Sequence, residues 1–422
     1  MHKYFTRLLE RSTRRLGPGL ITGAADDDPS GIATYSQAGA QFGFNMLWTV
    51  VFTYPLMVGI QIVSARIGRV TGKGLTANIR DRYPRWLLYS IVSLLVVANT
   101  INIAADIAAM GEALQLMVGG GQHGHAIVFG ALSLLLQVFM PYQRYVRMLR
   151  WLTLSLLAYV AVLFMVNVPW SEVLRHTVLP QLSFGTDFVT VVVAVFGTTI
   201  SPYLFFWQAS QEVEEMRADP RGEALVTSPQ VAHRHLLRIK IDTYIGMGFS
   251  NLIAFFIILS TAVTLHATGI TGIETSAQAA EALRPLAGDL TFFMFSMGII
   301  GTGMLAVPVL AGSAAYAMAD CFGWNQGLDR KLFEAKEFYA IIALATVAGV
   351  LLDFTPIHSI QALFWSAVIN GVIAVPIMAM MMLMAVRREV MGPFVISGRL
   401  KILGWLATLA MFMAVITMFV TW

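Results

Sequence analysis

Long apolar runs are the feature that most restricts how this sequence can fold. Eleven runs are bounded by charged residues or by Pro and Gly clusters, and a helix needs about 20 such residues to cross a bilayer. They cover residues 16–41, 44–67, 86–118, 126–141, 148–168, 188–212, 239–265, 288–318, 336–352, 357–386 and 401–421. Backbone groups in lipid have no solvent partner, and the runs are too long for strands. We therefore predict an all-α membrane protein with eleven transmembrane helices.

The low charge content supports the same conclusion. Only 12% of the 422 residues are charged, against about 25% in an average soluble domain. A soluble core cannot absorb this much apolar surface and still leave a wettable exterior. This composition excludes a soluble enzyme, a disordered chain and a nucleic-acid-binding protein.

The distribution of Lys and Arg predicts the orientation in the membrane. If the N-terminus lies inside, all but two of the 28 Lys and Arg residues fall on the cytoplasmic side, and only Arg175 and Arg284 lie outside. This asymmetry follows the positive-inside rule. We expect a cytoplasmic tail over residues 1–15, an external C-terminus and a location in the cell membrane.

Three consecutive carboxylates interrupt the first apolar run. Asp26, Asp27 and Asp28 stand directly before Pro29. Proline removes a backbone donor and clashes with the preceding turn, so the helix should break there. A break frees carbonyl oxygens, and it is tolerated at membrane depth only where it lines a cavity. Asp28 beside such carbonyls predicts a cation site, and the alternative is a kink with structurally paired aspartates.

A second proline, Pro202, interrupts the run at 188–212 in the same way. Five helices separate the two breaks, and because five is odd the second set starts from the opposite side of the membrane. Inverted repeats of this kind place their substrate site between two broken helices. We predict one repeat over 16–168, a second over 188–386 and an additional helix, the eleventh, over 401–421.

Four segments of the sequence carry a resemblance to a known family. They are GPGLITGAADDDPSG (17–31), RIGRVTGKGL (66–75), AADIA (104–108) and GTTISP (197–202). They resemble Nramp-type divalent metal transporters, which have the LeuT-like inverted-repeat fold of amino-acid transporters. The family's Asp-Pro-Gly-Asn motif of helix 1 is Asp28-Pro29-Ser30-Gly31 here. Its Met-Pro-His-Asn motif of helix 6 is Ser201-Pro202-Tyr203-Leu204.

The resemblance implies a metal site at the two breaks. In the family the ligands are an Asp and an Asn of helix 1, a Met sulfur of helix 6 and two backbone carbonyls. They correspond here to Asp28, Gly31, Ser201, Ala25 and Thr198. Gly31 has no amide, and Ser201 replaces a thioether with a hydroxyl. Oxygen ligands suit Mg²⁺ and Mn²⁺, and Mg²⁺ gives up its water reluctantly.

We therefore expect this chain to resemble the Nramp-related magnesium transporter branch. It would carry partly hydrated Mg²⁺, and also Mn²⁺, by alternating access, with no resident cofactor and no enzymatic activity. A Mn²⁺/Fe²⁺ carrier whose missing ligands are replaced by water is the alternative. An organic amine transporter on the same fold also stays open, because Asp28 would attract an amine.

Proton coupling is not expected. Proton-coupled members resemble one another in two histidines on helix 6 and in an Asp and a Glu one turn apart on helix 3. The matching positions here are Tyr203, Gln208, Asp106 and Ala109, so only the aspartate remains. All eight histidines fall in loops, tails or helix ends. Proton-coupled Mn²⁺/Fe²⁺ transport is kept as the alternative.

Other intramembrane polar residues each allow two interpretations. Asp106 with Glu112 could line a path or bond neighbouring helices, and Asn370 could face the cavity or make an interhelical hydrogen bond. Gly31, Tyr203 and Gln208 are further candidates for lining the cavity. Asp26 and Asp27 could concentrate cations in a vestibule or cap the helix break.

Overall fold

The computed structural model describes residues 17–140, 153–219, 222–355 and 358–422. The predicted tail over residues 1–15 lies outside the described residues, as does the beginning of the fifth predicted helix. Within the described ranges every regular element is helical. Eight stretches of described helix are long and apolar enough to cross a membrane, so the chain is a multi-pass membrane protein, and the count of eleven stays a prediction.

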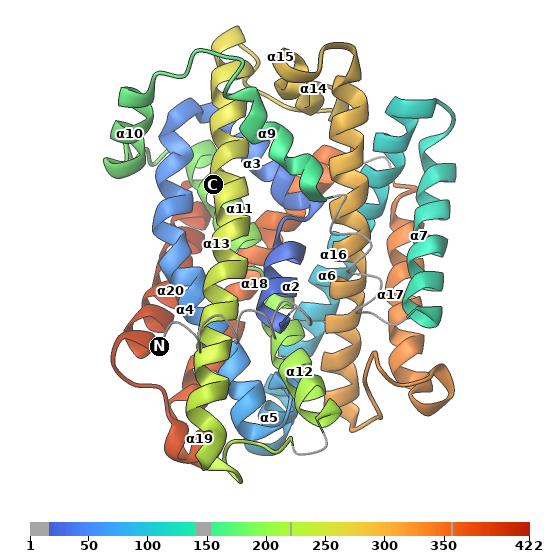
Figure 1. The fold of residues 1–422 in the computed structure, drawn as a ribbon, viewed down its shortest axis with the longest axis vertical. Helices are drawn as coiled ribbons and strands as arrows, with labels where there is room; N and C mark the ends of the chain where they lie inside the picture. The colour runs from blue at the N-terminus through green and yellow to red at the C-terminus, as the bar shows by residue number, and fades with distance from the viewer. Residues whose placement is uncertain (1–16, 141–152, 220–221, 356–357) are drawn as a thin grey trace, which may run out of the picture.

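The long helices follow the predicted order along the chain (Figure 1). The first half contains α2 (Pro18–Asp26), α3 (Pro29–Phe42), α4 (Leu47–Thr71), α6 (Arg85–Val118), α7 (Gln122–Phe139) and α9 (Leu157–Val162). The second half contains α11 (Thr186–Thr199), α12 (Pro202–Ala218), α13 (Ala232–Thr264), α16 (Thr291–Phe322), α17 (Lys336–Leu352) and α18 (Ser359–Ala385), and the chain ends with α20 (Gly398–Thr421).

Both predicted helix breaks are confirmed. The first run is divided into α2 and α3, and the run at 188–212 is divided into α11 and α12. Pro29 and Pro202 each begin the second half, where a missing N–H costs nothing. Asp28 caps α3, and its Oδ1 accepts from the Gly31 amide at 2.8 Å. The two breaks lie deep in the bundle, where α11 and α12 have their most apolar stretch fully buried.

The fifth predicted helix differs from the structure. In its described part the helix α9 ends at Val162, not at 168, and a separate helix α10 (Trp170–Val178) follows. Pro169 is the N-cap of α10, and a residue that precedes proline is disfavoured in the helical conformation, so α9 and α10 do not form one continuous helix. The scan for apolar runs also missed four short helices, which are too polar or too short to resemble membrane spans: α5 (Leu75–Arg82), α14 (Ser276–Ala280), α15 (Arg284–Ala287) and α19 (Arg388–Met391).

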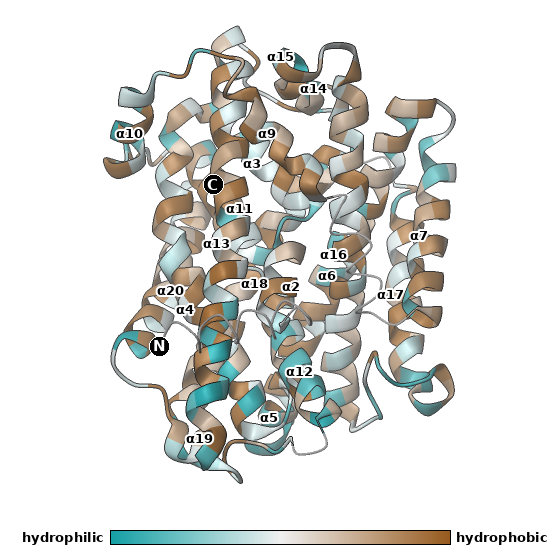
Figure 2. Ribbon diagram, viewed as in Figure 1, coloured by the Kyte–Doolittle hydropathy of each residue, from teal (hydrophilic) through white to brown (hydrophobic). Residues whose placement is uncertain are grey.

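The described loops that were predicted to be cytoplasmic meet at one end of the molecule. Arg69 on α4 contacts His235 on α13 at 3.0 Å, and Arg387 lies over the ring of Tyr83. Figure 2 shows hydrophilic residues gathered at this end, around α5 and the adjoining parts of α12 and α13, while the middle of the long helices is mostly hydrophobic. The helices α10 and α15, which carry Arg175 and Arg284, lie at the opposite end (Figure 1).

Candidate functional site

A tyrosine hydroxyl joins the two helix breaks. The Tyr203 hydroxyl, in the first turn of α12, lies 3.0 Å from the Ala25 carbonyl oxygen and 3.2 Å from Asp28 Oδ2. Ala25 is in the last turn of α2 and Asp28 begins α3, so one phenol contacts both edges of the first break. All three residues are buried. The hydroxyl therefore lies against the two oxygens that the sequence predicts as cation ligands.

Thr198 and Ser201 lie at the second break. The Ser201 hydroxyl is 2.7 Å from the Thr198 carbonyl oxygen and 2.9 Å from the Gly197 carbonyl oxygen. The hydroxyl donates its hydrogen to these carbonyl oxygens in the last turn of α11, so its lone pairs remain available for another partner. The Thr198 hydroxyl is buried without a hydrogen-bond partner in the described part of the chain. These two residues thus present several oxygens near the break.

The two breaks lie close together at Gly31. A Cβ at this position would lie 3.3 Å from Thr198 Oγ1 and 3.5 Å from the Asp26 carbonyl oxygen. Gly31 therefore faces the gap between α3 and the end of α11. The side chain that related transporters are expected to carry here would extend into this gap. Even a Cβ here would lie 3.3 Å from Tyr35 Cε2, so glycine allows the two breaks to approach closely.

Two further carboxylates, those of Asp26 and Asp27, lie next to the first break. The Ser250 hydroxyl, on α13, is within hydrogen-bond distance of both Asp26 Oδ2 and Asp27 Oδ1. Both carboxylates are buried, and Asp26 Oδ1 has no partner among the described residues. A serine hydroxyl donates only one hydrogen, so it satisfies one carboxylate at a time. Sequence reasoning missed Ser250 because a single serine in an apolar run is unremarkable.

Buried polar groups without partners continue along α6 and α18. Both oxygens of Asp106 and both polar atoms of Asn102 lack hydrogen bonds in the described part of the structure, as does Nδ2 of Asn370. Asn102 was not predicted, although its position one helical turn before Asp106 in an apolar run was an available signal.

Two other predicted residues have structural partners. Gln208 accepts from Gln61 Nε2 at 2.6 Å and donates to Thr243 Oγ1 at 3.0 Å, so it connects α12 to α4 and α13. Glu112 accepts from the Ser276 amide at 3.0 Å and from the Ser359 hydroxyl, and so holds α6 to the first turns of α14 and α18. For Glu112 these contacts favour interhelical bonding over a role in a path.

The atoms that could bind a cation at the breaks are oxygens. No three His, Cys, Asp or Glu side chains in the described ranges come together as metal ligands. A cation at this place would depend on the Asp28 carboxylate together with carbonyl and hydroxyl oxygens. Such a mixed oxygen set is suited to hard cations and leaves positions for water.

Comparisons with known proteins agree with this architecture. The family described as natural resistance-associated macrophage protein-like (Nramp) matches residues 19–421. The chain is 26% identical over 393 residues to a divalent metal cation transporter MntH of Acidiphilium cryptum, which covers 90% of this chain and 84% of the relative. It is 28% identical over 323 residues to the MntH of Erwinia tasmaniensis, with 72% of this chain and 73% of that protein covered.

Solved structures share the fold. A manganese transporter of Eremococcus coleocola matches with a TM-score of 0.76 and 16% identity, over 99% of this chain and 88% of that chain. The transporter Mhp1, in an inward-facing conformation, matches with a TM-score of 0.56 and 13% identity, over 96% of this chain and 90% of that chain. The predicted LeuT-like architecture is thereby confirmed. With the family model matching nearly the whole sequence, the chain belongs to the Nramp family.

Proposed function

We propose that this protein transports divalent metal cations, most readily Mg²⁺ and also Mn²⁺, by alternating access across the cell membrane. One observation carries the proposal. The Asp28 carboxylate and the Ala25 carbonyl both lie at the first helix break, and the hydroxyl of Tyr203, on the second broken helix, contacts each of them. Family membership and the names of the curated relatives, which are divalent metal cation transporters, support the same substrate class.

The choice of Mg²⁺ rests on one residue at each break, Ser201 at the second and Gly31 at the first. Ser201 provides a hydroxyl where related transporters are expected to provide a sulfur ligand, and Gly31 provides no side-chain ligand. Oxygen ligands without sulfur favour hard cations, and Mg²⁺ keeps part of its water when it binds. The ion would be bound by Asp28, the carbonyl oxygens of Ala25 and Thr198, and Ser201.

Transport without proton coupling is part of the proposal. The membrane potential contributes about 2.3 kcal/mol per elementary charge per 100 mV, which already drives a divalent cation inward. We also infer that the N-terminus lies in the cytoplasm and the C-terminus outside. Proton-coupled Mn²⁺ or Fe²⁺ transport is the second candidate, and one observation favours it. Asp106 is buried without a hydrogen-bond partner in the described part of the chain, and a proton could neutralise it.

A flux assay in proteoliposomes tests the substrate and the coupling together. Purified protein is reconstituted into liposomes that contain a Mg²⁺ indicator or a pH-sensitive dye. Uptake of Mg²⁺ and Mn²⁺ is started by a membrane potential that is negative inside. We expect uptake of both ions without a change in internal pH. Acidification that accompanies uptake and depends on Asp106 would support the second candidate instead, and no uptake of either ion would contradict the proposal.

Restoring a sulfur ligand should shift the ion preference. In Ser201→Met the thioether takes the place of a hard hydroxyl, so binding of Cd²⁺ and Mn²⁺ should strengthen relative to Mg²⁺ by about tenfold or more. Isothermal titration of the purified variant with the three ions measures the ratio. Ser201→Ala is the matched control, because it removes the hydroxyl without adding sulfur. Equal ion ratios in the two variants would contradict the prediction.

Removing the Tyr203 hydroxyl should tighten ion binding. This hydroxyl bonds to the Ala25 carbonyl oxygen and to Asp28, and a cation that binds there must displace its hydrogen. A hydrogen bond to a charged group contributes about 1.5–3 kcal/mol. Tyr203→Phe is therefore expected to bind Mn²⁺ roughly tenfold more tightly or better in isothermal titration. Weaker binding would show that the phenol oxygen is itself a ligand.

A further inference from the structure

A basic pocket opens at the end of the molecule that carries α5, away from the helix breaks. It has a volume of about 310 Å³ and lies between α5, the C-terminal ends of α12 and α16, and the segment 323–330. Four cationic side chains line it from four parts of the chain: Lys73, Arg80, Arg217 and Arg330. A single carboxylate, Asp320, lines it as well. The lining therefore has an excess of positive charge.

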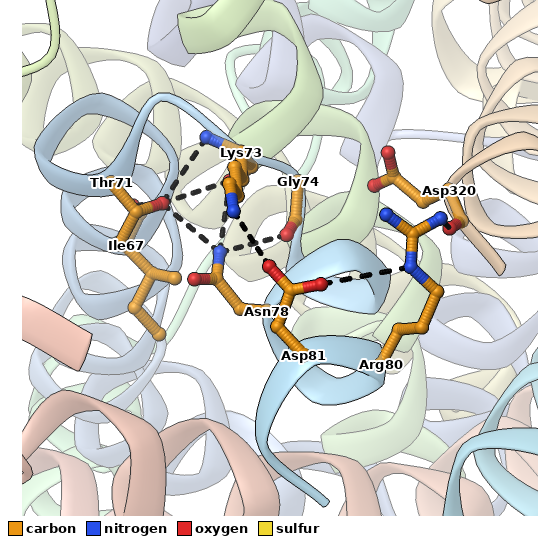
Figure 3. Close-up of polar contacts among 8 residues, drawn as sticks. All are labelled: Ile67, Thr71, Lys73, Gly74, Asn78, Arg80, Asp81 and Asp320. Carbon is orange, nitrogen blue, oxygen red and sulfur yellow. Dashed lines mark hydrogen bonds and ion pairs between the residues drawn. The ribbon is translucent and has the colours of Figure 1, made fainter. Parts of the chain in front are cut away.

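The wall around Lys73 is held by a dense set of hydrogen bonds (Figure 3). Asn78 Nδ2 donates to Thr71 Oγ1 at 3.0 Å and to the carbonyl oxygens of Lys73 and Gly74 at 3.1 and 2.9 Å. The Lys73 amide donates to Thr71 Oγ1 at 3.2 Å. Gly72 adopts φ +68°, which glycine tolerates best. These contacts fix the turn between α4 and α5 before any ligand binds.

Gly74 lets this turn approach α16. A Cβ at Gly74 would lie 2.0 Å from Asp320 Oδ2, so a larger residue would require this carboxylate to move. Arg80 Nη1 donates to the Asp320 carbonyl oxygen and closes the same side of the pocket. The turn belongs to the RIGRVTGKGL segment, which lies outside the proposed ion site. A fixed turn beside several cationic side chains is the arrangement expected in a binding pocket.

Three neighbouring carboxylates already have partners. Asp320 Oδ1 accepts from Gln326 Nε2 at 2.6 Å, and Asp81 pairs with Lys73 at 2.6 Å and with Arg80 at 3.7 Å. Glu214, which lies behind the segment 323–330, accepts from Tyr316 at 2.6 Å and from the Leu328 amide at 2.8 Å.

The arginines that remain are therefore well placed to meet an external anion. Arg217 extends from the last turn of α12, and Arg330 follows the segment that closes the pocket. Both are exposed to solvent, so an anion can reach them. Planar guanidinium groups suit the paired oxygens of phosphate.

We propose that this pocket binds a phosphate-bearing anion. The ligand is either a soluble phosphate compound or the headgroup of an anionic lipid, since the pocket lies at the ends of membrane helices. This inference is independent of the proposed transport function, because the pocket shares no residue with the ion site. An occupant would contact α5, α12 and α16 at once and would tie α12, half of a broken helix, to its neighbours.

Pyrophosphate binding to the purified full-length protein tests the soluble source. Isothermal titration is carried out in detergent, at low ionic strength and without divalent cations. We expect one site per chain and at least a tenfold loss of affinity in the double variant Arg217→Ala/Arg330→Ala. The control is Arg399→Ala/Lys401→Ala, which removes two exposed basic side chains of α20 outside the pocket and should bind as wild type does.

Nanodiscs test the lipid source. Thermal unfolding midpoints are compared in phosphatidylcholine alone and with phosphatidylglycerol added. If the headgroup is the ligand, phosphatidylglycerol should raise the midpoint of the wild type and of the control more than that of the pocket variant. Equal midpoints for the three proteins in phosphatidylcholine show that the substitutions leave the fold intact. The proposal is overturned if the pocket variant matches wild type both in pyrophosphate affinity and in its response to phosphatidylglycerol.

Discussion

Asp28→Asn should weaken divalent cation binding by about 100-fold and abolish measurable uptake. Loss of one charge from a buried pair costs about 3 kcal/mol or more, which corresponds to this factor in affinity. The substitution is nearly isosteric. The asparagine oxygen can still accept from the Gly31 amide, so the first turn of α3 should keep its cap. Isothermal titration with Mn²⁺ and Mg²⁺, followed by proteoliposome uptake, measures the effect.

An exposed aspartate supplies the control for this experiment. Asp329 lies on the surface near the end of α16, and Asp329→Asn removes the same charge from the chain. Its ion affinity and uptake should stay within a factor of two of wild type, a rough margin for surface substitutions. If Asp28→Asn transports as well as Asp329→Asn does, the Asp28 carboxylate is not an ion ligand, and the proposed site is wrong.

Gly197→Ala should disrupt the packing that positions the second break. A Cβ on Gly197 would lie 2.0 Å from the Ala367 carbonyl oxygen and 2.5 Å from the Gly371 amide nitrogen. These are backbone atoms of α18, so no side-chain rotation relieves the clash, and α11 and α18 must separate. Overpacking of this kind costs about 1–3 kcal/mol and occasionally more. We expect a lower thermal unfolding midpoint and a reduced yield of folded protein.

Gly124→Ala is the matched control for the glycine prediction. A Cβ at Gly124 meets nothing within 4 Å, and this residue is in the first turn of α7. Alanine is favoured over glycine in a helix by about 1 kcal/mol, so the midpoint should stay the same or rise. Equal midpoints for Gly197→Ala and Gly124→Ala would show that α11 and α18 are less tightly packed than the structure indicates.

The breaks in the two central helices were predictable from the sequence because their cause is local. Pro29 and Pro202 remove a donor wherever they stand, and aspartate before proline is a common helix cap. The predicted ligand Asp28 follows from its position at the first break, whereas Ala25 and Thr198 were predicted from the resemblance to the Nramp family.

The interactions across the breaks were not predictable in the same way. That Tyr203 reaches back to Ala25, and that Ser250 lies between Asp26 and Asp27, depends on how helices far apart in the sequence cross. Composition and periodicity contain no information on such crossings. The short helix α5 was missed for a different reason, since only apolar runs were sought and its residues are largely polar.

The glycine contacts of the first broken helix restrict how the protein can move. A Cβ on Gly23 would lie 2.3 Å from the backbone of Gly246, and one on Gly39 would lie 2.3 Å from the Ile258 carbonyl oxygen. Both halves of this helix thus pack closely against α13, while α11 packs closely against α18. Of the proposed ion ligands, Ala25 and Asp28 belong to the helix that packs on α13, and Thr198 belongs to α11, which packs on α18. In the proposed transport cycle we expect the ion to be released when the packing between these helices changes.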